Sequence, residues 1–383
     1  MDHLPLDLID NILFRLDPIS VIVMQCTNKF LRTYISDPKF DSYRFSLVGS
    51  SLFYISRHAP FYVTCQENII RSYPCYILGS CSGLLLLDIG GCFFVANPFT
   101  NRSRPLDHSG SKILYDIVTC VKWVDKAMCV GFAVDRIQNQ TKKRFKIVCI
   151  VKMQMMYGFE ISDGHSWRLS ETTITSSSKS DLAKRTKPVY LEGTLHWLRN
   201  DGSIIAFNPE TEQACFIPSV FHQEPETELF FASDDKINRL TLVSGTKEEI
   251  SVYTLAENAK WALARQIKNV FMEQCELEFW SLVMYDGKRL VVREKKRNLE
   301  GVFHVYDMEA NNWGVLGSTF WSSKGVTDFY KLTPSLSFVE EDEVKDNIPC
   351  YDPQASYLTA VMRSTDSPLA FGGLILVIFA YLK

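Results

Sequence analysis

The sequence predicts a small all-α unit of three helices at the N-terminus, followed by a long all-β region. Three observations carry this prediction. Apolar residues in the first 44 positions recur at helical spacing. From about residue 47, short apolar runs alternate with glycine, asparagine, aspartate and proline, as in strands joined by turns. The β region also contains a loose repeat, which indicates a modular fold.

The first helix is predicted from an apolar stripe that begins at Leu4. Its members are Leu4, Leu8, Ile9, Ile12, Leu13 and Leu16. Steps of one, three and four residues place these side chains on one helical face. Asp17-Pro18 ends the helix, because the residue before a proline avoids the α-helical region.

A second short helix is expected over 19–25, where apolar residues lie nearly all round. Asn28 is a typical N-terminal cap for a third helix, which Asp37-Pro38 ends. Three helices of this size bury too little surface to be comfortably stable alone. Two interpretations remain: a helical cap packed on the following domain, or a motif that docks on a partner protein.

Three blocks within these helices resemble an F-box in order and spacing: Leu4-Pro5-x-x-Leu8-Ile9-x-x-Ile12-Leu13-x-Arg15-Leu16, Cys26-x-x-Lys29-Phe30 and Ile35-Ser36-Asp37-Pro38-x-Phe40. Asp17 stands where a proline is often found, and Phe30 where tryptophan is frequent. The resemblance implies binding to the Skp adaptor of a Skp–cullin–F-box ubiquitin ligase. Carried over to this sequence, the apolar docking face would comprise Leu4, Pro5, Leu8, Ile12, Leu13, Leu16, Val21 and Phe30.

The β region repeats a strand, a polar turn and a return strand. The turn positions are 97, 163, 208, 255 and 307, and their spacing is close to the roughly 50-residue period of kelch blades. Glycine-containing turns at 79–83, 191–194 and 285–288 precede the turn positions 97, 208 and 307, so they belong to the same repeat. We therefore predict a kelch-like β-propeller of about six blades over 47–365, arranged as a ring of four-stranded sheets. A pair of open β-sandwiches is the alternative.

Three segments also resemble the F-box-associated, kelch-like region of plant F-box proteins: 79–85 (GSCSGLL), 95–102 (VANPFTNR) and 191–198 (LEGTLHWL). The full double-glycine signature of kelch repeats is missing. The expected domains are an F-box at 1–44, the propeller at 47–365 and an apolar tail at 366–383. The apolar run at 369–382 is short for a membrane-spanning helix, so we expect a buried strand or an extension there.

Composition excludes several other classes of protein. The formal net charge of −3 gives no basic face for nucleic acid. The eleven cysteines contain no C-x-x-C pair, which argues against a zinc ribbon and for buried free thiols in a reducing compartment, the nucleus or cytoplasm. No basic segment precedes an apolar one at the N-terminus, so we expect no secretory signal.

No catalytic motif is present: the sequence lacks H-E-x-x-H, G-x-S-x-G and a P-loop. The turn at 79–83 precedes a strand rather than a helix, and His196 is expected to be a packed core residue. We therefore predict a non-catalytic substrate receptor without cofactor or metal, whose target is unknown. The alternative is a β-propeller hydrolase or sugar-modifying enzyme with a helical cap. The loops at 172–187 and 340–346 are candidates for a substrate-facing rim.

Overall fold

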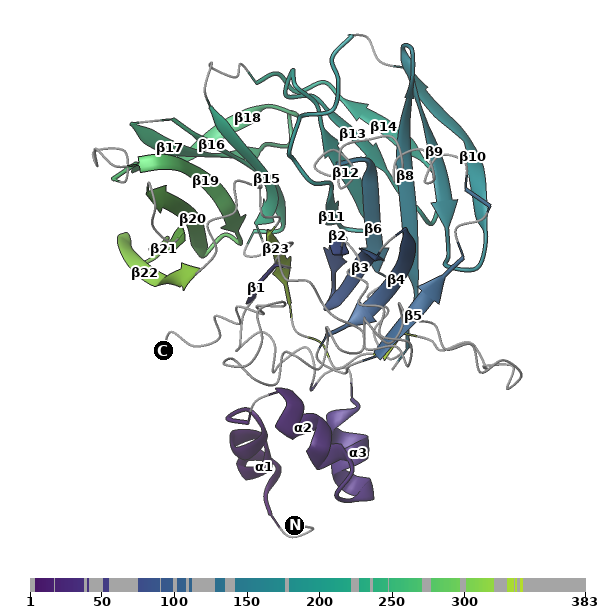
Figure 1. Cartoon of the computed structure of the whole chain (residues 1–383), viewed down its shortest axis with the longest axis vertical. Helices are drawn as coiled ribbons and strands as arrows, with labels where there is room; N and C mark the ends of the chain where they lie inside the picture. The colour runs from purple at the N-terminus through teal and green to yellow at the C-terminus, as the bar shows by residue number, and fades with distance from the viewer. Residues whose placement is uncertain are drawn as a thin grey trace, which may run out of the picture. The chain divides into compact units, whose positions relative to one another are not determined.

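A computed structural model describes the helices and most strands of this chain (Figure 1). The described residues are 4–16, 18–37, 40, 51–54, 75–89, 91–98, 102–107, 110–111, 128–134, 142–175, 179–221, 227–234, 237–246, 248–270, 277–296, 301–319, 329–333, 335 and 338–339. Contacts divide the chain into two compact units. Unit 1 comprises 1–107, 134–145 and 331–383, and unit 2 comprises 108–133 and 146–330. The rim loop expected at 340–346 and the apolar tail at 366–383 lie outside the described residues.

Three short helices form the N-terminal part of unit 1: α1 (Leu6–Leu13), α2 (Pro18–Gln25) and α3 (Lys29–Ile35). The side chain of Asn28 caps α3 as expected, because its carbonyl oxygen accepts the backbone N–H of Leu31 at 2.7 Å. Helices α1 and α3 are joined by a hydrogen bond of 2.6 Å from the Tyr34 hydroxyl to Asp10. The three helices share a small core of Ile9, Leu13, Val21, Leu31, Ile35 and Phe40.

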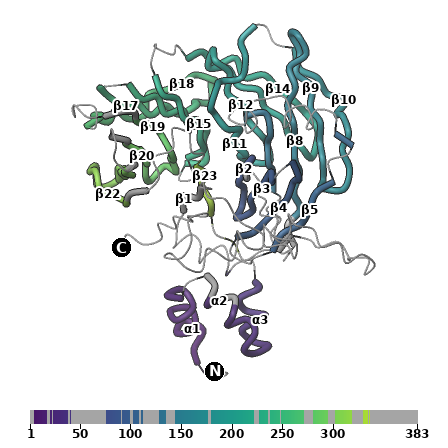
Figure 2. The backbone as a smooth tube through the Cα atoms, in the orientation of Figure 1, coloured from purple at the N-terminus to yellow at the C-terminus, as the bar shows by residue number. Residues whose placement is uncertain are grey.

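Five four-stranded sheets follow, which we call blades (Figure 2). In unit 1 one blade contains β2 (Cys75–Cys81), β3 (Leu84–Ile89), β4 (Cys92–Asn97) and β5 (Arg102–Leu106). The first two blades assigned mainly to unit 2 contain β6 (Val130–Val134), β8 (Phe145–Met153), β9 (Met156–Ser162) and β10 (Trp167–Thr175), then β11 (Val189–Leu191), β12 (Thr194–Leu198), β13 (Ile204–Phe207) and β14 (Ala214–Ile217).

The last two blades contain β15 (Glu228–Asp234), β16 (Arg239–Gly245), β17 (Glu249–Leu255) and β18 (Trp261–Lys268), then β19 (Leu277–Tyr285), β20 (Arg289–Lys296), β21 (Gly301–Asp307) and β22 (Asn312–Thr319). Short strands outside the blades are β1 (Ser51–Tyr54), β7 (Lys142–Lys143), β23 (Phe329–Leu332) and β24 (Phe338–Val339). The five blades found in the described residues are close to the predicted number of about six.

The predicted repeat coincides with a single structural position. Each of the turn positions 97, 163, 208, 255 and 307 lies at or just after the end of the third strand of a blade. In three blades the side chain there closes the turn. Asp307, for example, accepts the backbone N–H groups of Glu309 and Ala310, each at 2.8 Å. These two N–H groups also lower the pKa of Asp307 below its usual value. In these three blades the repeated feature is thus an Asx turn.

Within unit 2, consecutive blades are joined by shared apolar clusters. Phe159 of β9 stacks on Phe207 of β13, with ring centroids 4.2 Å apart. A second cluster contains Leu198 of β12 and Leu242 of β16. A third contains Val243 of β16 and Trp280 of β19. Each blade therefore buries one face against its neighbour, which is the packing expected for propeller blades.

The outer strands of three blades contain β-bulges. The register of β10 shifts between Leu169 and Thr173. The register of β18 shifts at the residues that face Val252 and Tyr253 of β17. In β22 it shifts opposite Phe303 and His304 of β21. A bulge bends and twists a strand and interrupts its ladder of hydrogen bonds.

Candidate functional site

Helix α1 presents two adjacent apolar stripes. One stripe, Ile9 and Leu13, is turned into the shared core and is almost completely buried. The other follows Leu4, Leu8 and Ile12 at steps of four residues, and these side chains are 40%, 49% and 44% exposed. Leu8 and Ile12 lie one above the other on α1, because residues four apart share a helical face, and the exposed Leu4 directly precedes the N-cap residue Pro5.

The structure distributes the eight residues predicted for adaptor binding over two environments. Leu4, Pro5, Leu8, Ile12 and Phe30 are exposed, and Leu16 is half-buried against the core.

Leu13 and Val21 are only 1% and 0% exposed. These two side chains belong to the core, so they hold the helices together and do not contribute exposed surface. Helical periodicity places all the apolar residues of α1 on one broad face and does not separate its buried part from its exposed part. Binding of the adaptor by this set stays a prediction.

Two further exposed apolar side chains were missed by the sequence analysis. Leu6 on α1 is 53% exposed and lies off the stripe, and Val23 on α2 is 58% exposed. The nearly all-apolar run around Val23 predicted a helix covered on most sides, and no local signal marked this side as open. On α3, the ring of Phe30 stacks on Tyr34 at a centroid distance of 5.8 Å, which supports Phe30 at the surface.

The hydroxyl that joins α3 to α1 is partly buried and lies beside acidic groups. Burial, together with the hydrogen bond to Asp10 and its charge, raises the pKa of Tyr34 to about 12. Tyr34 therefore remains a neutral hydrogen-bond donor at physiological pH. The aromatic rings of Phe14 and Phe40 stack at 5.4 Å and close the core near the end of α1.

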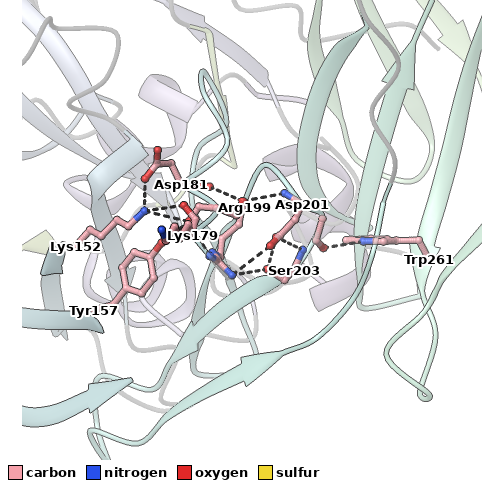
Figure 3. Close-up of polar contacts among 10 residues, drawn as sticks. Lys152, Tyr157, Lys179, Asp181, Arg199, Asp201, Ser203 and Trp261 are labelled. Carbon is pink, nitrogen blue, oxygen red and sulfur yellow. Dashed lines mark hydrogen bonds and ion pairs between the residues drawn. The ribbon is translucent and has the colours of Figure 1, made fainter. Parts of the chain in front are cut away.

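In unit 2, the described part of the expected rim loop is anchored to the blades (Figure 3). Residues 179–187 are described, and Ala183 is buried. The guanidinium of Arg199, which is completely buried, donates to the Ser180 carbonyl at 2.6 Å and to the Ser203 hydroxyl at 3.0 Å. Its Nη1 also lies 3.4 Å from the Asp201 carboxylate. The sequence predicted a loop here, and a buried cation holds this half of it in place.

The turn at 79–83 joins strands β2 and β3, as the sequence predicted. Ser82 and Gly83 both have positive φ, and a Cβ on Gly83 would lie only 2.4 Å from that of Ser335. His196 is a buried core residue, as expected. Its Nδ1 lies 3.3 Å from the Val189 carbonyl, and burial lowers its pKa to about 4.

No metal-binding cluster of three or more His, Cys, Asp or Glu side chains occurs among the residues that the structure describes. Within the same ranges, no helix is both long and apolar enough to cross a bilayer. Six cysteines of the described ranges are free thiols: Cys26, Cys81, Cys92, Cys129, Cys149 and Cys215. Burial raises the pKa of the Cys149 thiol well above its usual value, which makes it a poor nucleophile.

Comparison with protein families matches residues 1–43 to the F-box domain and residues 33–298 to the F-box associated beta propeller domain. The chain is 55% identical to an Arabidopsis thaliana protein named for F-box and kelch repeats, over 96% of each chain. It is 58% identical to an F-box protein of the same plant, covering 72% of this chain and 95% of the relative. These matches confirm the predicted fold, a helical F-box followed by a β-propeller.

Proposed function

Because this chain belongs to the plant-type F-box proteins with an F-box-associated β-propeller, we propose that it is the substrate-recognition subunit of a Skp–cullin–F-box ubiquitin ligase. In this proposal the N-terminal helices bind a Skp-type adaptor, and through it a cullin. The propeller binds the target protein. The nucleus or cytoplasm is the proposed location, since the ligase acts on intracellular targets.

The exposed stripe of Leu4, Leu8 and Ile12 is the observation that carries the proposal. The three helices already have a core, so this stripe is not needed to complete their own packing. Burying a leucine or isoleucine side chain contributes about 1.5–3 kcal/mol, and these side chains are about half exposed. Covering the stripe with an apolar partner surface would therefore contribute several kcal/mol to binding.

The proposed mechanism is proximity, and it requires no catalytic residue in this chain. A target held on the propeller is kept near the ubiquitin-conjugating enzyme recruited through the cullin. Tethering turns an encounter between two molecules into an intramolecular one, with an effective concentration set by the geometry of the assembly. The surface of the propeller then determines which protein is modified.

Co-purification of the full chain with a Skp-type adaptor tests this proposal. We expect the double variant Leu8→Asp, Ile12→Asp to lose the adaptor, because two carboxylates would be buried in an apolar interface. Leu6→Asp is the matched control, since Leu6 lies on the same helix, is 53% exposed and is off the stripe. This control should retain the adaptor. Equal binding by the wild type and the double variant would refute the assignment of the stripe.

A further inference from the structure

The turn between the second and third strands differs in character among the described blades of unit 2. In the blades of β11–β14 and β15–β18 this turn is polar, with the sequences RNDGS at 199–203 and TKE at 246–248. In the blade of β6–β10 it is a methionine cluster. Met153, Met155 and Met156 are 41%, 36% and 42% exposed. Exposed apolar groups gathered in one place mark interaction sites more often than isolated ones do.

The methionine hairpin, defined as residues 152–157, forms the tip of the two long strands β8 and β9. β8 and β9 contain 9 and 7 residues, whereas β12 and β13 of the next blade contain 5 and 4. The β8–β9 hairpin is the tall pair at the upper right of Figure 1. Three to four additional residues per strand lengthen a strand by roughly 10–13 Å. The hairpin therefore presents its tip beyond the short strands of its neighbour.

Two of the methionines share one face of this hairpin. Met153 and Met156 are direct cross-strand partners, so their side chains lie side by side. The next residue on that face is Gly158, and a Cβ there would lie only 2.7 Å from the Met153 methyl carbon. The glycine thus leaves room for the Met153 side chain over the strand. Met155 adds a third thioether in the turn itself.

The opposite face of the hairpin is fixed to the rest of unit 2 (Figure 3). Lys152 and Tyr157 form the adjacent cross-strand pair, and alternation along the strands turns them away from Met153 and Met156. The Tyr157 hydroxyl donates to the Ser180 carbonyl at 3.1 Å. The Lys152 ammonium donates to the same carbonyl at 3.3 Å and forms an ion pair with Asp181. A binding surface gains affinity when its backbone is fixed in advance in this way.

We propose that the methionine hairpin is a target-docking element that binds an apolar peptide segment with acidic neighbours. This inference rests on the proposed function, because it assigns the target to one part of the propeller. Methionine side chains are flexible and polarizable, and they are enriched in protein interfaces. On the opposite face of the hairpin the Lys152 ammonium is paired with Asp181, and the exposed Lys179 adds one further positive charge. This excess positive charge next to the hairpin tip favours a partner with acidic residues beside its apolar segment.

Selection from a random peptide library displayed on phage tests the proposal, with the full chain bound to its adaptor as bait. We expect enriched peptides to combine Leu, Ile or Phe with Asp or Glu. They should bind the triple variant Met153→Ser, Met155→Ser, Met156→Ser at least about tenfold more weakly than the wild type. Leucine at the same three positions should restore most of the affinity, since leucine keeps the apolar surface.

Leu263→Ser is the matched control, because Leu263 is 50% exposed on β18 of the same unit and lies outside the hairpin. It should leave peptide binding unchanged. Peptides that bind the triple variant as well as the wild type would overturn the proposal, as would basic peptides or no enrichment. A hairpin-dependent dimer of the wild type would overturn it too, by showing that a second copy is the occupant. Adaptor binding, measured in parallel, reports separately on the proposed function.

Discussion

Replacing Arg199 by methionine tests whether a buried cation stabilises the propeller. The side chain is completely buried, and it joins the 179–181 loop to the turn that follows β12 (Figure 3). Methionine has a similar length and no charge, so the change removes the polar contacts while filling much of the space. The guanidinium also lies over the rings of Tyr157 and Phe216, at 5.8 and 5.4 Å from their centroids.

The expected magnitude follows from two opposing terms. The hydrogen bonds to the Ser180 carbonyl and the Ser203 hydroxyl involve a charged donor and contribute about 2 kcal/mol each. Removing a buried charge recovers its desolvation cost, which is about 1–4 kcal/mol when apolar residues of similar volume replace a buried ion pair. Asp201 is 35% exposed and keeps water after the change, so its loss of a partner costs little. The hydrogen bonds outweigh the desolvation term, and we expect a net loss of about 2 kcal/mol.

Urea unfolding of the full chain, followed by circular dichroism and tryptophan fluorescence, measures this loss. Agreement between the two probes is needed before one free energy is assigned to the transition. Lys152→Met is the control, because Lys152 contacts the same loop from a solvent-accessible position and should cost less than about 1 kcal/mol. An Arg199→Met variant as stable as the wild type, or more stable, would show that desolvation dominates and would refute the reasoning.

Two further predictions concern burial and backbone geometry. The pKa of His196 is lowered to about 4, so the folded state favours the neutral imidazole. This contribution to the free energy of unfolding is fully present above pH 6.5 and is lost as the pH falls towards 4. Relative to His196→Gln, the wild type should lose about 2 kcal/mol between pH 7.5 and pH 5 in urea unfolding; parallel pH profiles would contradict this. Gly202→Ala should cost more than about 3 kcal/mol in the same assay, since the new Cβ would lie 2.3 Å from the backbone nitrogen of Phe221 at a φ of +81°. Gly91→Ala, at a φ of +91° with open space, should cost only about 1 kcal/mol, and equal costs would exclude the steric explanation.

The blades were predictable because their repeat is formed by local chemistry. An Asx turn needs one aspartate or asparagine at one place, and Asp163, Asn208 and Asp307 each accept backbone N–H groups two and three residues ahead. Such a turn is visible in the sequence whatever surrounds it. The approximate blade number followed from the same spacing. Irregular intervals, such as that between 97 and 163, limited its accuracy.

The division of α1 into buried and exposed stripes was not predictable from its sequence. Leu8 and Leu13 are the same residue type on one broad apolar face, and only the position of α2 and α3 decides which of them is covered. The burial of Arg199 is a second example. Its partners Ser180 and Ser203 come from segments on both sides of it in the chain, and an arginine in a polar turn sequence normally indicates a solvated residue.

The bulges of β10, β18 and β22 have a consequence for how the propeller meets other chains. An outer strand carries unpaired backbone groups along its free edge, and a regular edge can accept a strand from any unfolded polypeptide. Each bulge divides that edge into shorter lengths with a changed direction. A receptor of the proposed kind would meet many other polypeptides, and indiscriminate backbone pairing would make it a seed for aggregates. Side chains at the turns are then left to discriminate between partners, and they can change in evolution without disturbing the sheets beneath them.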